Sequence, residues 1–247
     1  MASQKTFWNK EYESSKNFSL SDRPAEDLLK FTRYLERASG RQFLNPTINI
    51  LDLGSGNGRN LIYLAKTYGC RGTGYDISEV AIKQAKQATQ TLVEISPREK
   101  SLRSDSLPKP LNFEARSIAG KFDLADNSFD IVLDMMTSHY LVAEERAALV
   151  SEIFRLLKPG GWLFYKTFLL DNDRNAKRML QENPAAEPNS YIHPTIGFME
   201  HVSNEEEIRS LYEPRFEIEK IEKSGKHILH GKAGKRRSII VYMRKSF

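Results

Sequence analysis

The stretch Ile48–Asn60, INILDLGSGNGRN, decides the expected fold of this chain. Its first half is an apolar run, which is typical of a parallel strand covered by helices on both faces. Three glycines, Gly54, Gly56 and Gly58, follow the acidic Asp52, and apolar residues then recur at helical spacing. Glycines permit unusual backbone angles and let a ligand approach the main chain closely. A turn of this kind, between a strand and a helix, is where open α/β sheets bind ligands.

The spacing of the glycine turn favours one ligand over another. A dinucleotide fingerprint counted from Gly54 requires a small residue at position 59, and Arg59 stands there, which weakens the case for a dehydrogenase. The residues follow instead an Asp-x-Gly-x-Gly-x-Gly pattern that begins at Asp52. In this pattern the chain resembles the small-molecule type of class I methyltransferase, which depends on S-adenosylmethionine (SAM). The resemblance implies that the turn, including Ser55, packs against the methionine part of SAM and that Asp52 helps to hold that end.

The next expected strand, Gly72–Asp76, also ends in a carboxylate, and Ser78 is placed to cap the helix that follows. A carboxylate can accept hydrogen bonds from both hydroxyls of a ribose. In the resembled family the acid at this place binds the ribose of SAM, so Asp76, with its neighbour Ile77, is expected to do so here. The alternative is an acidic cap on the helix.

Further stretches match the family in order. Asn127–Asp134 is similar to its fourth strand and Leu156–Leu163 to its helix, turn and fifth strand, in which Pro159 to Gly161 would end a helix containing Leu157. The resemblance covers residues 7–168 well. It implies an α/β fold of the Rossmann-like methyltransferase type, with a doubly wound, mostly parallel seven-stranded sheet. The segments 216–222 and 238–243 are expected to close the sheet as a C-terminal antiparallel hairpin.

The residues after the third and fourth strands are the remaining cofactor candidates. Family members often carry an acid after the third strand, near the adenine, where this chain has Ser117 and Ile118. The Ser117 hydroxyl and the Ile118 backbone N–H and side chain are expected to meet the ring instead. Asp134, at the end of the fourth strand, completes the predicted cofactor-binding set.

His139 and Tyr140 follow the fourth strand at the edge where the acceptor of the methyl group is expected. An imidazole titrates near neutral pH, so His139 is the best general-base candidate, with a pocket-lining or structural role as the alternative. Direct SN2 transfer does not demand a base, because holding a nucleophile in line with the methyl carbon supplies much of the acceleration. Tyr140 is expected to line the acceptor site.

Two segments are expected to cover the site. Residues 1–47 are predicted to form a helical N-terminal cover in which Trp8 and Tyr12 line the acceptor site and help to exclude water, unless they only pack onto the core. Arg23 and Lys16 are equal candidates for the SAM carboxylate. The long proline-bearing segment 171–202 is predicted to be a second, substrate-covering insertion.

The second cover also carries His193, which is expected to line the acceptor site. It contains a further histidine, but no local group of ligands has the spacing that a metal requires, so no metal is predicted. The polar segment 96–110 is expected to be an exposed loop without an assigned role.

Composition limits the number of domains and the class of protein. The 247 residues are 40% hydrophobic, contain one cysteine and no apolar run long enough to cross a bilayer, and begin without the pattern of a secretory signal. These features predict a single domain over residues 1–247 that is soluble and cytoplasmic, with no membrane partner. The sequence does not indicate the oligomeric state.

The formal charge of +5 is concentrated late, in residues 223–237. Such a run is usually solvated surface, but it also suits an anionic small substrate or RNA. The sequence predicts a methyltransferase that converts SAM to S-adenosylhomocysteine by transfer to a small molecule. The alternatives are an RNA or protein methyltransferase that uses the 223–237 loop, and a SAM-binding protein without catalysis. Neither the acceptor nor the methylated atom is indicated.

Overall fold

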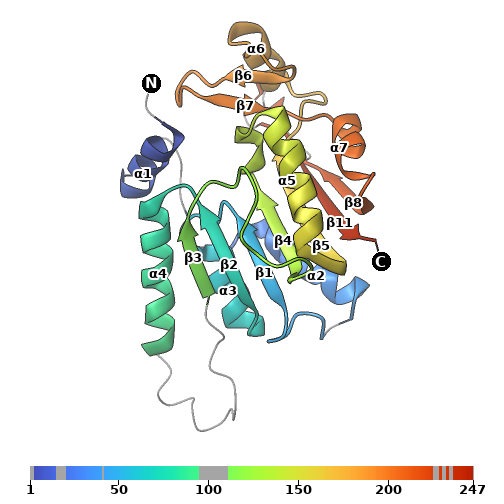
Figure 1. Ribbon diagram of the computed structural model, residues 1–247. Coiled ribbons are helices and arrows are strands. Elements are labelled where there is room, and N and C mark those ends of the chain that lie inside the picture. The colour runs from blue at the N-terminus through green and yellow to red at the C-terminus, as the bar shows by residue number, and fades with distance from the viewer. Residues whose placement is uncertain are drawn as a thin grey trace. The chain divides into compact units, whose positions relative to one another are not determined.

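A computed structural model describes residues 3–14, 21–40, 42–94, 111–224, 228–229, 232–233 and 236–246 (Figure 1). The segment 96–110, Lys16 and part of the basic 223–237 loop lie outside these residues. The helices are α1 (Gln4–Ser14), α2 (Glu26–Ala38), α3 (Arg59–Tyr68), α4 (Glu79–Glu94), the 3-10 helix η2 (Ser138–Tyr140), α5 (Ala143–Leu156), α6 (Arg174–Glu182) and α7 (Glu205–Tyr212).

The strands are β1 (Asn49–Leu53), β2 (Arg71–Asp76), β3 (Leu111–Ala115), β4 (Phe129–Met135), β5 (Leu157–Phe168), β6 (Ser190–Ile192), β7 (Met199–His201), β8 (Phe216–Lys223), β9 (Ile228–Leu229), β10 (Lys232–Ala233) and β11 (Ser238–Lys245). Seven of them form one sheet in the order β3-β2-β1-β4-β5-β11-β8. β2 pairs in parallel with both β1 and β3, whereas β11 pairs antiparallel with both β5 and β8. The predicted Rossmann-like sheet with its antiparallel C-terminal hairpin is confirmed.

Internal packing divides the chain into two compact units. The N-terminal unit contains residues 2–118 and 129–131, and the C-terminal unit contains residues 119–128 and 132–247. The division follows the sheet, since β1, β2 and β3 belong to the first unit and β5, β8 and β11 to the second. The single domain expected over the whole chain stays a prediction.

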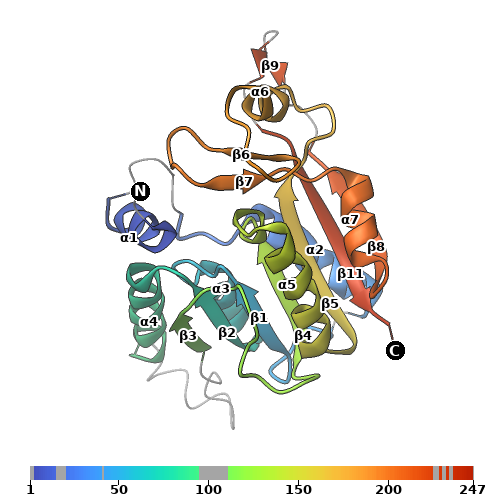
Figure 2. The same ribbon diagram turned by 45° about the horizontal axis from the view of Figure 1, so that its top comes forward.

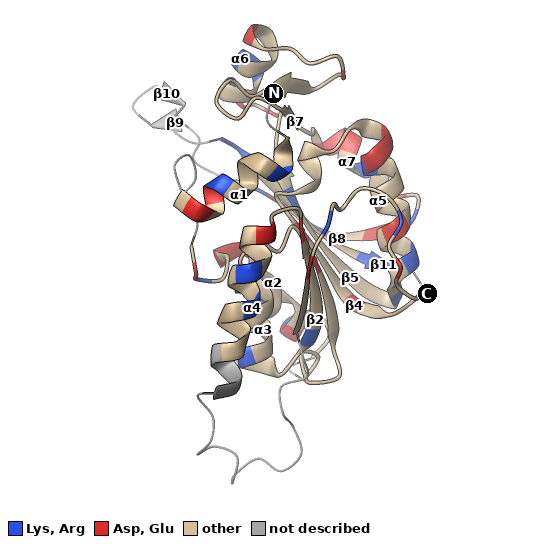
Figure 3. Ribbon diagram, turned by 60° about the vertical axis from the view of Figure 1, so that its left-hand side comes forward, with Lys and Arg blue, Asp and Glu red and all other residues tan. Residues whose placement is uncertain are grey.

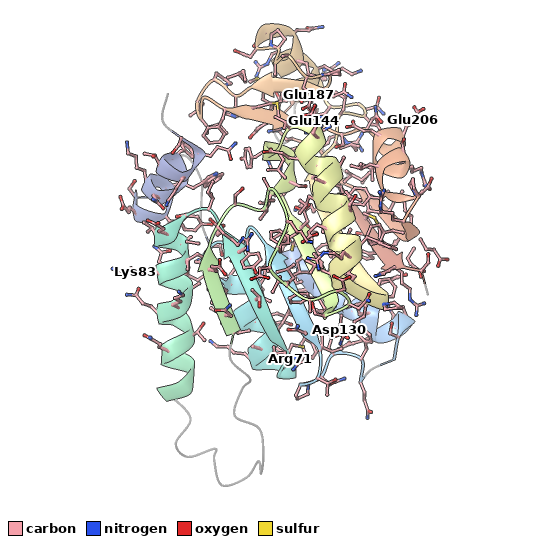
Figure 4. The ribbon with its side chains drawn as sticks, in the orientation of Figure 1. Arg71, Lys83, Asp130, Glu144, Glu187 and Glu206 are labelled. Atoms are coloured by element: carbon pink, nitrogen blue, oxygen red, sulfur yellow. The ribbon has the colours of Figure 1, made fainter. Side chains whose placement is uncertain are left out.

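The N-terminal unit is built on the buried strand β1. Ile50 and Leu51 have no exposed surface, as expected for a strand covered on both faces. The neighbouring strand approaches so closely that a Cβ at Gly72 would lie 2.7 Å from the carbonyl oxygen of Ile50. At the start of β1 the Asn49 N–H donates to the carboxylate of Asp130, which is labelled in Figure 4. These contacts fix the strand whose carboxyl end opens into the glycine turn.

The C-terminal unit packs α5 and β5 with the C-terminal hairpin. Here one expectation about boundaries is wrong: α5 ends at Leu156 and β5 begins at Leu157, before Pro159. A proline disfavours helical angles at the residue before it, so the chain is already extended when Pro159 is reached. The amine of Lys245 donates to the carbonyl oxygens of Phe154 and Leu157, at 2.7 Å each, and so satisfies groups at the helix end.

The segment 171–202 folds as α6 and the β6–β7 hairpin, which lies beyond the carboxyl end of β5 in Figure 2. The helix that follows it, α7, begins with three acidic residues, visible as a red first turn in Figure 3. Acidic side chains stabilise a helix N-terminus because they complement its dipole. The cap itself is Asn204, whose side chain accepts from the Glu207 N–H at 2.7 Å.

Candidate active site

The glycine turn of the N-terminal unit follows β1 directly. Its entry is held by the carbonyl oxygen of Tyr75, which accepts from the N–H groups of Gly54 and Ser55 at 2.7 and 2.8 Å. Gly56 and Gly58 have φ angles of +55° and +77°. A side chain makes this left-handed region costly, so the turn requires glycine at both positions.

Asp76 ends β2 beside this turn and is tied to it. Its Oδ2 accepts from the Gly56 N–H at 2.9 Å and its Oδ1 from the Ser78 N–H at 2.8 Å. The side chain is buried, and burial raises its pKa, against the lowering effect of the two backbone hydrogen bonds. Each carboxylate oxygen keeps acceptor capacity beyond one N–H, so Asp76 fits a ligand that offers two neighbouring hydroxyls.

Tyr12 of α1 lies over the glycine turn. A Cβ added at Gly56 would stand 2.3 Å from its Oη. Burial and then the charge of Asp76 raise the pKa of the Tyr12 hydroxyl, with a smaller contribution from Asp52. The structure thus brings together three predicted site residues, Tyr12, Asp52 and Asp76, from three separate elements.

Helix α1 is held in this place by the start of α4, as Figures 1 and 2 show. The Asn9 side chain accepts from the Ser78 hydroxyl at 2.8 Å, and Gln84 donates to the carbonyl oxygen of Tyr12 at 2.8 Å. Lys5 and Glu79 add an ion pair at 2.7 Å. Trp8 of the same helix is partly buried and packs edge-on against its neighbour Phe7.

The residues of the turn also fit a polar ligand group. Ser55 is 5% exposed, and among the described residues its hydroxyl has no hydrogen-bond partner. A buried polar group without a partner costs free energy that a ligand can relieve.

The other predicted cofactor residues follow the ends of β2 and β3. Ile77 comes directly after Asp76, while Ser117 and the buried Ile118 come two and three residues after the end of β3.

In the C-terminal unit, Asp134 is completely buried near the end of β4. Its Oδ1 accepts from the Ser138 N–H at 3.2 Å, and so it fixes the start of η2. Burial raises its pKa to about 6, opposed by hydrogen bonds from Ser138 and Thr137. The carboxylate therefore positions the short helix that carries His139 and Tyr140.

His139 is 2% exposed and lies between two aromatic rings. Its ring centroid is 4.0 Å from that of Tyr140 and 5.1 Å from that of Phe168. In the described part of the chain neither ring nitrogen has a hydrogen-bond partner. Burial lowers the pKa of His139 to about 3. The imidazole is therefore neutral at pH 7, and a base this weak is poorly matched to proton abstraction at that pH.

The buried imidazole makes stability depend on pH. Since His139 has an ordinary pKa near 6.5 when unfolded, protons bind the unfolded chain preferentially between about pH 6.5 and pH 3. The contribution of the neutral ring is present above this window and is lost as the pH falls through it. We expect the free energy of unfolding of the wild type to fall relative to His139→Phe by up to about 1.4 kcal/mol per pH unit below pH 6. Urea unfolding of the wild type and of His139→Phe at pH 7, 6 and 5 measures this difference. The same change in the free energy of unfolding for both proteins over this pH range would contradict the prediction.

Two charged residues that the sequence did not single out meet beside His139. Glu200 of β7 is 2% exposed, and its carboxylate accepts from the Tyr191 hydroxyl at 2.5 Å and from Arg236 at 2.6 Å. The guanidinium of Arg236 lies 3.3 Å from the ring centroid of Phe168. Glu200 and Arg236 are far apart in the sequence and meet only in the folded chain. The one feature that could have pointed to them is a charged residue, Glu200, inside the short strand β7.

The ring centroid of His193 lies 6.2 Å from that of Tyr191, and the residue is bonded within its own turn. Its ring Nδ1 accepts from the backbone N–H of Thr195 at 3.2 Å, and its backbone N–H donates to the carbonyl oxygen of Phe198 at 3.0 Å. It therefore stabilises the turn between β6 and β7. Phe198 packs edge-on against Tyr140, so the turn and η2 are in contact.

The β6–β7 hairpin is anchored to α5 through Glu187, which Figure 4 labels beside the start of that helix. Its carboxylate accepts from the Ala143 N–H at 2.8 Å and pairs with Arg146. His201 adds contacts of 2.9 Å to Ser190 and 2.7 Å to Glu207. These bonds hold the strand that carries Glu200.

The described residues contain no group of three or more histidine, cysteine or acidic side chains arranged to hold a metal ion. Within the same residues, none of the helices combines the length and apolarity required to cross a membrane.

The strand order, with a glycine turn after β1 and a buried acid at the end of β2, defines the Rossmann-like class of SAM-dependent methyltransferases. Residues 51–165 match the family described as "Methyltransferase domain". This part of the chain therefore forms a class I methyltransferase domain, and the resemblance noted from the sequence is confirmed.

One curated relative is the glycine/sarcosine/dimethylglycine N-methyltransferase of Actinopolyspora halophila. It is 29% identical over 148 residues, which cover 58% of this chain and 22% of the relative. The chain spans between about a fifth and about a half of the length of the curated relatives it matches.

Solved structures share the fold. A SAM-dependent methyltransferase from Methanosarcina mazei is 25% identical, with a TM-score of 0.64 and coverage of 81% of this chain and 92% of its own. The Burkholderia thailandensis 1,6-didemethyltoxoflavin-N1-methyltransferase, solved with 1,6-didemethyltoxoflavin and S-adenosylhomocysteine, has 16% identity, a TM-score of 0.62 and coverage of 98% and 87%. The family match supports SAM as the cofactor and methyltransferase chemistry for the matched domain.

Proposed function

We propose that this protein transfers the methyl group of SAM to a small-molecule acceptor by direct SN2 displacement. The observation that carries the proposal is the buried carboxylate of Asp76, which is hydrogen-bonded to the glycine turn and keeps acceptor capacity for a ribose. The methyltransferase domain match and relatives that act on small molecules support it.

The cofactor contacts are assigned by position in the turn. Asp76 binds the ribose hydroxyls, and Asp52 and Ser55 hold the methionine end. The full set of proposed cofactor residues is Asp52, Gly54, Ser55, Gly56, Gly58, Asp76, Ile77, Ser117 and Ile118. Asp134, which is completely buried, acts instead by holding η2 in place.

When bound, SAM supplies a methyl group on a sulfonium, which is already a good leaving group. The protein has to hold the acceptor in line and exclude water. Tyr12 and Trp8 on α1 exclude water, and Tyr140 contacts the acceptor. His139 lines the acceptor site as a neutral ring rather than acting as a general base, because its pKa lies far below the working pH.

A polymer acceptor receives less support. Lys223, in the basic 223–237 loop, pairs with Asp171 at 3.0 Å and with Glu205 at 2.8 Å. Arg237 donates to the carbonyl oxygens of Asp171 and Ser224. Cations engaged in this way are poor contacts for the phosphates of RNA.

Calorimetric titration with SAM, S-adenosylhomocysteine and NAD tests the cofactor. We expect micromolar binding of the two adenosyl ligands, and binding of NAD alone would refute the proposal. Transfer of radiolabel from methyl-labelled SAM to a panel of small amines, phenols and acids then separates an enzyme from a protein that only binds SAM. Transfer to RNA but to no small molecule would favour the polymer alternative.

A further inference from the structure

The guanidinium of Arg236 is held at one end by a carboxylate and on one face by an aromatic ring. Its Nη1 donates to Glu200 at 2.6 Å. Its carbon atom stacks 3.3 Å from the ring centroid of Phe168 and lies 5.5 Å from that of Tyr191. An arginine that is paired and stacked in this way has a fixed orientation.

Glu200 has little capacity left for another ligand. Besides Arg236, its oxygens accept from the hydroxyls of Tyr191, at 2.5 Å, and Tyr140, at 3.3 Å. Burial opposes ionisation, yet Arg236 and the hydrogen bond from Tyr191 hold the pKa of Glu200 below its usual range. The carboxylate is therefore ionised and serves as the fixed counter-ion of the guanidinium.

The other edge of the guanidinium is left open. Nε and Nη2 of Arg236 are buried, and in the described part of the chain neither has a hydrogen-bond partner. The two nitrogens of His139, which packs on the same Phe168 ring, are likewise buried without a partner there. A buried donor without a partner costs free energy, so this arrangement favours a ligand that accepts hydrogen bonds.

We propose that the Nε and Nη2 edge of Arg236, with His139 beside it, binds an anionic group of the methyl acceptor, a carboxylate or a phosphate. The two parallel N–H donors of the guanidinium edge match two oxygens of a carboxylate or a phosphate. A lysine amine acts as a point charge and lacks this match. His139, being neutral, offers one N–H to the same group. This assignment of an acidic acceptor rests on the proposed function.

The test titrates the protein with acetate and with inorganic phosphate at constant ionic strength, and compares three variants. Arg236→Gln removes the charge. Arg236→Lys keeps a cation beside Glu200 but lacks the two-donor edge, so it remains informative if the first variant folds poorly. Arg178→Gln removes the same charge from an exposed site on α6 and is the matched control.

We expect the wild type and Arg178→Gln to bind at least one of the two anions equally well. Arg236→Lys is expected to weaken that binding about tenfold or more, as loss of a charge-assisted pair predicts. The anion that binds identifies a carboxylate or a phosphate acceptor. Absence of binding to the wild type, or equal affinities in all variants, would overturn the proposal.

Titration of the same proteins with S-adenosylhomocysteine separates this proposal from the proposed function. Loss of anion binding in Arg236→Lys, with unchanged S-adenosylhomocysteine affinity, supports the anion subsite. Failure of S-adenosylhomocysteine to bind the wild type would refute the methyltransferase proposal, whatever the result with the anions.

Discussion

Asp76→Ala is expected to weaken SAM binding about 100-fold, equivalent to about 3 kcal/mol. We have proposed this buried carboxylate as the acceptor for both ribose hydroxyls, so its removal deletes those hydrogen bonds. The substitution also leaves the Gly56 and Ser78 N–H groups without their acceptor. Calorimetric titration with SAM and S-adenosylhomocysteine measures the loss.

Two variants separate recognition of the ribose from support of the turn. Asp76→Asn keeps a carbonyl oxygen that can accept from one N–H, so the turn is retained better while the charge is lost. Glu114→Ala removes an exposed acid from β3 in the same unit and is the control for charge. We expect Glu114→Ala to bind SAM as the wild type does. Full SAM affinity in Asp76→Ala would rule out the assignment of Asp76.

Gly56→Ala is expected to lower the free energy of unfolding by about 3 kcal/mol and to weaken SAM binding. The φ of +55° costs an alanine about 1–2 kcal/mol. The new methyl group would also stand 2.3 Å from the Tyr12 hydroxyl oxygen, and relief of such overpacking costs about 1–3 kcal/mol more. Urea unfolding measures the sum.

A double-mutant cycle with Tyr12→Phe isolates the steric part. Removal of the hydroxyl leaves the ring carbon that bore it as the nearest atom, at 3.2 Å, so Gly56→Ala should cost about 1–2 kcal/mol less in that background. Gly40→Ala is the control for backbone strain, since Gly40 has a φ of +93° and nothing within 4 Å of its Cβ position. A coupling energy near zero would mean that α1 does not lie over the turn in solution.

The sequence by itself was enough for the type of sheet, with its antiparallel C-terminal hairpin, and for the position of the glycine turn. The apolar run before Asp52, the spaced glycines and the carboxylate at position 76 are local patterns, and each reflects a local requirement of strand, turn or helix start. Ser78 is such a case, because its hydroxyl accepts from the Ala81 N–H at 3.1 Å, as a helix cap should. Strand, turn and cap patterns of this kind depend on residues that are neighbours in the sequence, so the sequence alone can predict them.

Boundaries were less certain because tertiary packing decides them. The helix expected to contain Leu157 ends instead at Leu156. Several residues are acceptable locally at this helix end, and the hydrogen bonds formed after folding select one.

Only the tertiary structure decided which side chains meet. Tyr12 reaches the turn because α1 docks on α4, and Glu200 meets Arg236 because the β6–β7 hairpin packs near the start of β11. The pKa of His139 is likewise a property of the fold, since burial lowers it from near 6.5 to about 3. Contacts and burial of this kind join residues far apart in the chain, so no local pattern records them. The sequence determined the glycine turn, and the fold determined the helix that covers it and the candidate acceptor site.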